Sequence, residues 1–471
     1  MKASRMSCGC SEVFELQIIV RMRALLLSGA ILGAFGVISY ASAETLGDAL
    51  SGAYHHNSTL EADRARQRAT DELVPQALSG WRPTVTAQGS VGHQVLNSST
   101  GGYVVTNPEQ LTISLSQPIF RGFKTVEGTA VAEANVEAGR QQLLSVEQTT
   151  LFNAVQAYMN VVQNRQILVL RRKNVSVLSG QLNGSQARFK AGELTRTDVA
   201  LSRATLSGAQ GQVAIAISNL LAAEANYRTV VGHAPGKLNM PHLASRPRTL
   251  NIAYDIAQET NPAILAAAQV QDAAEHQVEV VGGDLLPTIN LQASASLNNE
   301  SSSPGTSSSS ALVQGVLTVP IYEAGRVYSG VRQAKETASQ NRVQVISAVR
   351  SVRESVTVAW NSIDATGQAL SATRDQVSAS RLALDGVRQE YQVGSRSTID
   401  VLNAEQSLVG AQISEVTAQH DQLVASYQLL AAIGHLTARH LGITGIYDVK
   451  EHYNDVRNKW IGLDPETGEP H

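Results

Sequence analysis

The chain has 471 residues, a formal net charge of −3 at pH 7, and only 4% aromatic residues. This length could form two or three ordinary domains, but so few aromatic residues leave little to fill large globular cores. The slightly acidic balance argues against binding nucleic acid through a basic surface.

The first predicted element is a secretion signal over residues 1–43. Two arginines precede an apolar run over residues 24–38, and an A-x-A sequence ends at Ala43. This order is typical of a signal peptide, with cleavage expected between Ala43 and Glu44. An uncleaved anchor helix is the alternative, but the run is shorter than the ~20 residues that cross a membrane. Met22 opens a complete signal by itself and is an alternative start of translation.

After residue 43 the sequence repeats itself at an offset of about 202 to 204 residues. Matching pairs include Pro83 and Pro287, Gly192 and Gly394, Asp198 and Asp400, and Gly232 and Gly434. We therefore predict two copies of one structural plan, residues 44–240 and 241–445, followed by a polar tail over residues 446–471.

Each copy begins with a predicted helical segment, residues 45–78 and 249–282, in which apolar residues recur at helical spacing. Asn261-Pro262 should interrupt the second segment. Two alternating stretches follow in each copy, residues 83–92 and 110–117, then 289–298 and 312–321. Period-two alternation predicts strands with one apolar face. The polar connectors, residues 97–102 and 301–307, are expected to be flexible loops.

Very long helices should complete each copy. No proline occurs between Pro118 and Pro235, or between Pro320 and Pro465, and both tracts are rich in helix-forming residues. Only Gly192 and Gly394 interrupt these tracts, so the pattern predicts two long coiled-coil-like hairpins.

The four strands permit two interpretations. A soluble sheet would need a core that the scarce aromatic residues cannot fill. Strands that are apolar on one face and uncharged but polar on the other suit a membrane barrel with a wet interior. Four strands cannot close a barrel, and open edges in lipid leave backbone groups unsatisfied. Several chains would therefore have to share one barrel.

The order of these parts resembles the TolC family of outer-membrane efflux and secretion channels. The resemblance covers residues 44 to about 440 and includes the step Pro118-Ile119-Phe120 after the second strand, repeated as Pro320-Ile321-Tyr322. It implies an α+β membrane protein with long α-helical coiled-coil hairpins and four β-strands per chain in a shared, trimeric 12-stranded transmembrane barrel. It also implies a homotrimer in the Gram-negative outer membrane, embedded in lipid, with a helical tunnel in the periplasm.

The resemblance further implies partners and roles. The hairpin tips would dock a periplasmic adaptor (membrane fusion) protein that works with an inner-membrane RND, MFS or ABC transporter. The expected docking residues are Gly192, Glu193, Leu194, Gly394 and Ser395. The chain would be a passive conduit and not an enzyme, and we expect no cofactor, no metal and no nucleic-acid partner.

The family's narrow periplasmic entrance maps to the second hairpin. Asp400 matches an acidic position of the constriction, and Asn403 stands where the family often has a second acid. Contacts that close the entrance would involve Tyr391, Arg396, Thr197 and Asp198, including an Arg396–Asp198 ion pair.

A simpler interpretation of the two aspartates needs no entrance. Thr195-x-x-Asp198 and Ser397-x-x-Asp400 both fit a helix-capping pattern. The functional alternative is a periplasmic coiled-coil adaptor or scaffold protein without a barrel, which would leave the four alternating strands unexplained.

Overall fold

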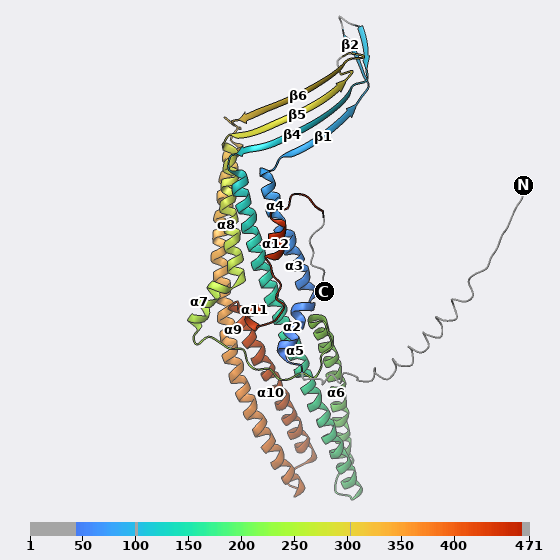
Figure 1. The fold of residues 1–471 in the computed structure, drawn as a ribbon. Coiled ribbons are helices and arrows are strands. Elements are labelled where there is room, and N and C mark those ends of the chain that lie inside the picture. The colour runs from blue at the N-terminus through green and yellow to red at the C-terminus, as the bar shows by residue number, and fades with distance from the viewer. Residues whose placement is uncertain (1–43, 99–101, 302, 464–471) are drawn as a thin grey trace, which may run out of the picture.

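The computed structural model describes residues 44–463 except 99–101 and 302. The predicted signal peptide, Ala43 included, and the last eight residues of the polar tail therefore lie outside the described residues. The chain forms an elongated helical body with a β-sheet at one end and two helical hairpin tips at the other (Figure 1).

Copy one begins with α2 (Leu46–His56), α3 (Ser58–Asp71) and α4 (Leu73–Leu78). Copy two begins with α7 (Leu250–Thr260) and α8 (Pro262–Gly282). The predicted interruption at Asn261-Pro262 is confirmed: the Asn261 side chain caps α8 and Pro262 occupies its first turn. Copy one has an unpredicted break at Asn57, whose side chain accepts hydrogen bonds from the amides of Thr59 and Leu60 and so starts α3.

The sheet contains β1 (Thr84–Val91), β4 (Glu109–Arg121), β5 (Thr288–Asn299) and β6 (Ser307–Thr318), in the order β1-β4-β5-β6 and entirely antiparallel. The prediction for the fourth strand was wrong at both ends. β6 starts at Ser307 because its serines pair with the end of β5, and it stops before Val319 and Ile321.

The expected flexible loop over residues 97–102 also needs correction. β2 (Gln94–Ser98) and β3 (Gly102–Thr106) form a separate antiparallel hairpin beyond the main sheet (Figure 1). Val95 lies opposite Val105 in this hairpin, and backbone pairing extends the strands into the polar residues.

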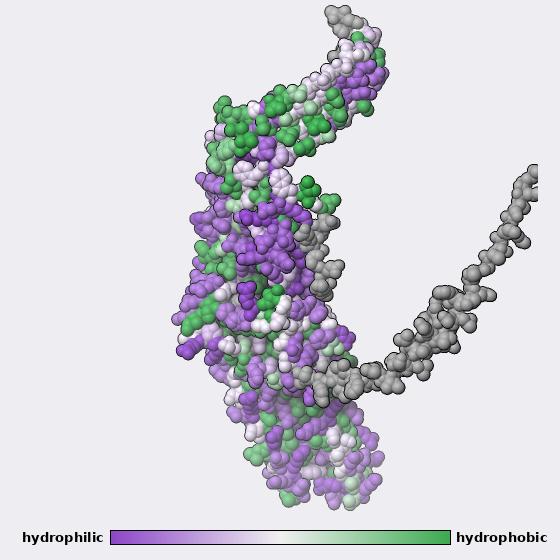
Figure 2. All heavy atoms as spheres, viewed as in Figure 1, coloured by the Kyte–Doolittle hydropathy of each residue, from purple (hydrophilic) through white to green (hydrophobic). Residues whose placement is uncertain are grey.

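The strand register gives the sheet two different faces. Val85, Leu115, Ala293 and Val313 lie side by side across all four strands, and so do Ala87, Ile113, Ala295 and Ala311. The opposite face carries rows such as Gln88, Thr112, Ser296 and Ser310. Large apolar residues on the first face remain exposed in one chain, Val313 by 71%, and Figure 2 shows hydrophobic residues along the sheet. An apolar face this exposed fits a lipid environment.

The long helices are confirmed. The first hairpin consists of α5 (Lys124–Lys190) and α6 (Arg196–Val231), and the second of α9 (Arg326–Gln392) and α10 (Thr398–Ala432). At 1.5 Å per residue, each 67-residue helix spans about 100 Å. The main hydrophobic core lies midway along the body, where Leu151, Tyr158, Tyr227 and Leu429 are almost fully buried.

After α10 the chain forms α11 (Ala438–Leu441) and α12 (Glu451–Val456). α12 packs on α3, where His452 Nδ1 lies 3.3 Å from Oδ2 of buried Asp71. The described part of the polar tail is therefore docked on the first copy. No helix of the described residues is both long and apolar enough to cross a membrane.

Candidate functional site at the hairpin tips

The two tips have the same backbone design. Gly192 has φ 81° and Gly394 has φ 83°, as expected for a tight turn that favours glycine. Each glycine amide donates to the carbonyl three residues earlier, and the next amide donates to the carbonyl five residues earlier. This pattern is a Schellman motif, which satisfies the last carbonyls of α5 and α9. No atom lies within 4 Å of a Cβ added at either glycine, so backbone conformation, not space, selects glycine.

The returning helices start with matching capping boxes. Asp198 accepts a hydrogen bond from the Thr195 amide (3.0 Å), and its own amide donates to Thr195 Oγ1 (3.2 Å). Asp400 and Ser397 repeat these contacts at 2.9 and 3.4 Å. The capping interpretation of both aspartates is therefore confirmed.

These contacts also set the protonation of the aspartates. The pKa of Asp198 is lowered because the Thr195 hydroxyl and amide both donate to its carboxylate. The pKa of Asp400 is lowered in the same way by Ser397, with a smaller contribution from Arg396. Both groups are thus negatively charged at neutral pH.

The expected Arg396–Asp198 ion pair is not formed within one chain. Arg396 Nε instead binds Glu390 Oε2 at 2.7 Å, across its own turn. The Asp198 carboxylate is already engaged by the backbone and side chain of Thr195. Both side chains therefore bind partners within six residues along the chain, and these contacts form within a single hairpin.

A different contact joins the two hairpins of one chain. The Arg188 guanidinium carbon lies 4.8 Å from the centre of the Tyr391 ring, while Arg188 Nε binds Glu193 Oε2 at 2.9 Å. Cation–π contacts of this kind are worth about 0.5–1 kcal/mol at exposed sites. Tyr391, named from sequence, is therefore a contact between the hairpins, but its partner Arg188 was missed because nothing in the sequence pairs residues so far apart.

The remaining named residues lie apart from these contacts. In the described part of the chain, Thr197 is exposed in the first turn of α6 and makes no side-chain hydrogen bond, and Asn403 is exposed one turn beyond Asp400. Leu194 is half-buried, and Glu193 and Ser395 are exposed. The tips thus present polar side chains together with the apolar side chain of Val393, which is 81% exposed.

A partly buried ion pair connects the two helices of the second hairpin above its tip. Arg388 Nη2 donates to Glu405 Oε1, and the Glu405 side chain is only 8% exposed. The first hairpin has a neutral contact at a similar level, between the hydroxyls of Ser185 and Ser202 at 3.2 Å. Neither pair was singled out from the sequence, since each depends on how two antiparallel helices align.

No group of three or more potential metal-ligating His, Cys, Asp or Glu side chains occurs within residues 44–463, leaving aside 99–101 and 302. The contacts at the tips are ion pairs, helix caps and packing contacts. Such contacts hold helices together, and the helices can separate when these contacts are broken.

Comparison with known proteins identifies a family and several relatives that are similar to this chain. The outer membrane efflux protein family matches residues 49–233 and 253–435, once in each half. The outer membrane efflux protein BepC of Brucella suis is 40% identical over 449 residues, covering 94% of this chain and 96% of that protein. TolC of Escherichia coli is 26% identical over 453 residues, covering 92% and 89%.

Solved structures agree on the fold. The CmeC outer membrane channel of Campylobacter jejuni superimposes with a TM-score of 0.75 at 15% identity, covering 88% of this chain and 89% of that one. These comparisons confirm the TolC-family resemblance and fold class, and they do not favour the periplasmic adaptor or scaffold alternative. The chain therefore belongs to the outer membrane efflux protein family and is an outer-membrane channel with a helical tunnel on the periplasmic side.

Proposed function

We propose that three copies of this chain close one barrel and act as a passive conduit with no chemistry of its own. The observation that carries this proposal is the sheet itself. β1 and β6 form its two edges, and neither has a further partner strand among the described residues. Each unpaired edge group in lipid would cost several kcal/mol. Because β1 and β6 run in opposite directions, β6 of one copy can pair antiparallel with β1 of the next.

Engineered disulfides test the closure. The only cysteines, Cys8 and Cys10, precede the expected cleavage site, so the processed chain offers a cysteine-free background. A panel combining Gln88→Cys or Ser90→Cys on β1 with Ser310→Cys or Gln314→Cys on β6 should give covalent dimers and trimers on oxidation. Each single-cysteine variant serves as a control and should give no trimer. A panel that yields only monomers would contradict a shared barrel.

Channels of this family work with a periplasmic adaptor and an inner-membrane pump. We propose that the adaptor docks at the two tips, through Gly192, Glu193, Leu194, Gly394 and Ser395, and that the pump is an RND, MFS or ABC transporter. These turns are exposed and combine polar side chains with the apolar side chain of Val393, which supports docking of a protein partner.

We also propose that the second hairpin forms the entrance, with Asp400 and Asn403 at the constriction. One charged aspartate per chain would give three carboxylates around the entrance of a trimer. Within a chain, Arg188 and Tyr391 hold the two hairpins together. Between neighbouring chains, Arg396 and the first turn of the outer hairpin, Thr197 and Asp198, would complete the closure.

Single-channel conductance in planar bilayers tests the entrance. Asp400→Asn removes the charge but keeps an oxygen that can cap α10, so any change reports on charge and not on unfolding. We expect altered conductance and weaker block by multivalent cations for Asp400→Asn, and higher conductance for Arg396→Ser. Asp375→Asn, at an exposed position of α9, is the matched control and should behave as wild type. Unchanged conductance in both tip variants would contradict the assigned constriction.

A further inference from the structure

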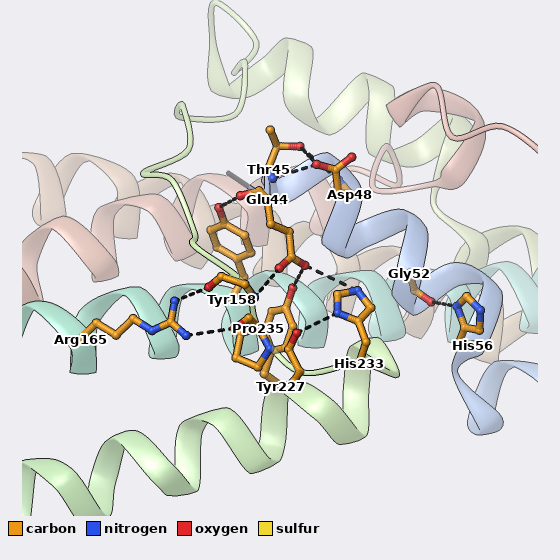
Figure 3. Close-up of polar contacts among 12 residues, drawn as sticks. Glu44, Thr45, Asp48, Gly52, His56, Tyr158, Arg165, Tyr227, His233 and Pro235 are labelled. Atoms are coloured by element: carbon orange, nitrogen blue, oxygen red, sulfur yellow. Dashed lines mark hydrogen bonds and ion pairs between the residues drawn. The ribbon is translucent and has the colours of Figure 1, made fainter. Parts of the chain in front are cut away.

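Glu44, the residue expected to begin the processed chain, lies in a polar site far from the tips. The site, here called the N-terminal niche, consists of Tyr158 of α5, Tyr227 of α6 and His233, Gly236, Lys237 and Asn239 of the segment that joins the two copies. Figure 3 shows the Glu44 side chain pointing between Tyr227 and His233.

The niche holds both the side chain and the backbone of Glu44. The Tyr227 hydroxyl donates to Glu44 Oε1, and the Gly236 amide donates to Oε2 at 2.9 Å. The Glu44 amide donates to the Lys237 carbonyl at 2.8 Å, and the Tyr158 hydroxyl lies 3.0 Å from the Glu44 carbonyl. Only 12% of the Glu44 side chain is exposed.

The fit around the carboxylate is close. A Cβ added at Gly236 would lie 3.3 Å from Glu44 Oε2, so a larger residue would crowd it. Arg165 braces the same turn by donating to the carbonyls of Pro235 and Gly236. Burial and the hydrogen bond to Glu44 raise the pKa of Tyr227, which keeps its hydroxyl protonated as a donor.

The second copy shows that helix packing alone does not require this polar site. At the repeat offset, Tyr227 corresponds to Leu429, Tyr158 to Trp360 and Glu44 to Arg248. Leu429 is buried as completely as Tyr227 but offers no hydrogen bond. The polar cluster therefore belongs to the copy that contains the expected N-terminus.

The niche has an imbalance of charge. Asp48, the capping residue of α2, is a second carboxylate close by. Among the described residues no lysine or arginine forms an ion pair with Glu44, and His233 Nε2 is 3.6 Å from Oε1 on a half-exposed ring. A carboxylate removed from water is costly without a compensating positive charge.

We propose that the niche is the binding site for the N-terminus of the processed chain, and that cleavage after Ala43 supplies its positive charge. Signal peptidase would hydrolyse the Ala43–Glu44 bond with one water molecule. Ala43 leaves as a carboxylate, and the new amine of Glu44 takes up a proton. The resulting ammonium keeps the hydrogen bond to the Lys237 carbonyl and adds two more protons and a full positive charge on the residue whose carboxylate the niche holds.

This inference depends on cleavage before Glu44 and is independent of the trimer and the entrance. The precursor has only a neutral amide at the same place. Removal of the signal would therefore strengthen the attachment of α2 to α5, α6 and the segment between the copies, and so couple processing to folding of the middle of the body.

An insertion tests the effect of the N-terminal ammonium while the other contacts of the niche are kept. One asparagine inserted between Ala43 and Glu44 keeps the Glu44 side chain and amide but moves the ammonium one residue away. Asparagine is not a small residue of the A-x-A type, so cleavage should stay after Ala43. We expect wild type to begin at Glu44, and the insertion to lower the unfolding temperature of the detergent-purified channel by several degrees.

A double-mutant cycle identifies the partner. Glu44→Gln alone should lower the unfolding temperature, and the insertion should have little further effect in that background, since both changes remove the same charge pair. In the Arg248→Gln variant, the matched position of copy two, the insertion should keep its full effect. A processed chain that begins elsewhere than Glu44, or an insertion that leaves the unfolding temperature unchanged, would overturn the proposal.

Discussion

In the first hairpin, 19 of the 67 residues of α5 are buried within the chain, whereas only 8 of the 67 residues of α9 are buried in the second. The helices have equal length, equivalent turns and equivalent caps at their tips. α5 packs against α3, α6, α8 and α10, but the main neighbours of α9 are α7, α8 and α10. One duplicated plan has thus produced an interior helix and a helix with an uncovered side.

The sequence of α9 reflects this difference. Val343, Val358 and Leu382 are exposed by 61, 56 and 76%. Their counterparts at the repeat offset are Gln141, Gln156 and Gly180. At these three positions the less covered helix exposes apolar side chains where the more covered helix has hydrophilic or small residues, so we expect that α9 receives further contacts from another copy of the chain.

The largest effect should come from placing a charge on that uncovered side. If a neighbouring chain covers Val358, Val358→Asp would bury a carboxylate without a partner, which costs about 3–5 kcal/mol. We expect the trimer to dissociate while the secondary structure of the monomer is retained, as measured by native mass spectrometry and circular dichroism. Val358→Thr, similar in shape but uncharged, is the control and should remain largely trimeric. A stable trimer in the Val358→Asp variant would contradict the inference that a neighbouring chain covers this side of α9.

A truncation pair tests the enclosed helix. Leu151 of α5 is 0% exposed, and its counterpart in α9 is Arg353, an exposed residue that stacks on Tyr254. Leu151→Ala should lower the free energy of unfolding by about 2–5 kcal/mol because it leaves a cavity. Arg353→Ala should lower it by less than about 1 kcal/mol. Urea unfolding in detergent would measure both, and equal losses would mean that burial within one chain does not distinguish the hairpins.

The smallest effect concerns acid and the two tips. The folded-state pKa values of Asp198 and Asp400 are lowered, so their capping contribution is present above the ordinary aspartate pKa of about 3.9 and is lost as pH falls through the lowered values. Below about pH 4, amides in the first turns of α6 and α10 should exchange with solvent progressively faster than expected from the intrinsic pH dependence of exchange.

Asp400→Asn provides the internal control for this experiment. The acid sensitivity of α10 should disappear in this variant, whereas that of α6, which depends on Asp198, should remain. If both first turns keep the same acid response, the capping carboxylates are not its cause.

The parts that sequence predicted well depend on neighbouring residues. Gly192 and Gly394 end long helical tracts, each capping box spans four residues, and Asn261-Pro262 stops a helix by backbone chemistry. The alternation in β4 and β5 likewise indicates their exposed apolar face without knowledge of their partners.

The parts that sequence missed depend on distant partners. Ser307–Ser310 carries no alternation and is a strand only because β5 lies beside it. Arg396 binds Glu390 in its own turn, and Arg188 of the first hairpin packs on Tyr391 of the second. The niche around Glu44 is assembled from three segments that are up to about two hundred residues apart, so no short pattern could reveal it.

The polar face of the sheet has a consequence for what crosses the membrane. Its rows contain threonine, serine, glutamine and asparagine, with Leu312 as an apolar exception, and the paired rows from Thr84 to Ser90 include no ionisable side chain. Where these rows enclose water, the wall neither attracts nor repels a solute according to the sign of its charge. This part of the barrel would then select by diameter, and discrimination between anions and cations would depend on charged side chains beyond these rows, such as Arg121, which pairs with Thr288 on the same face.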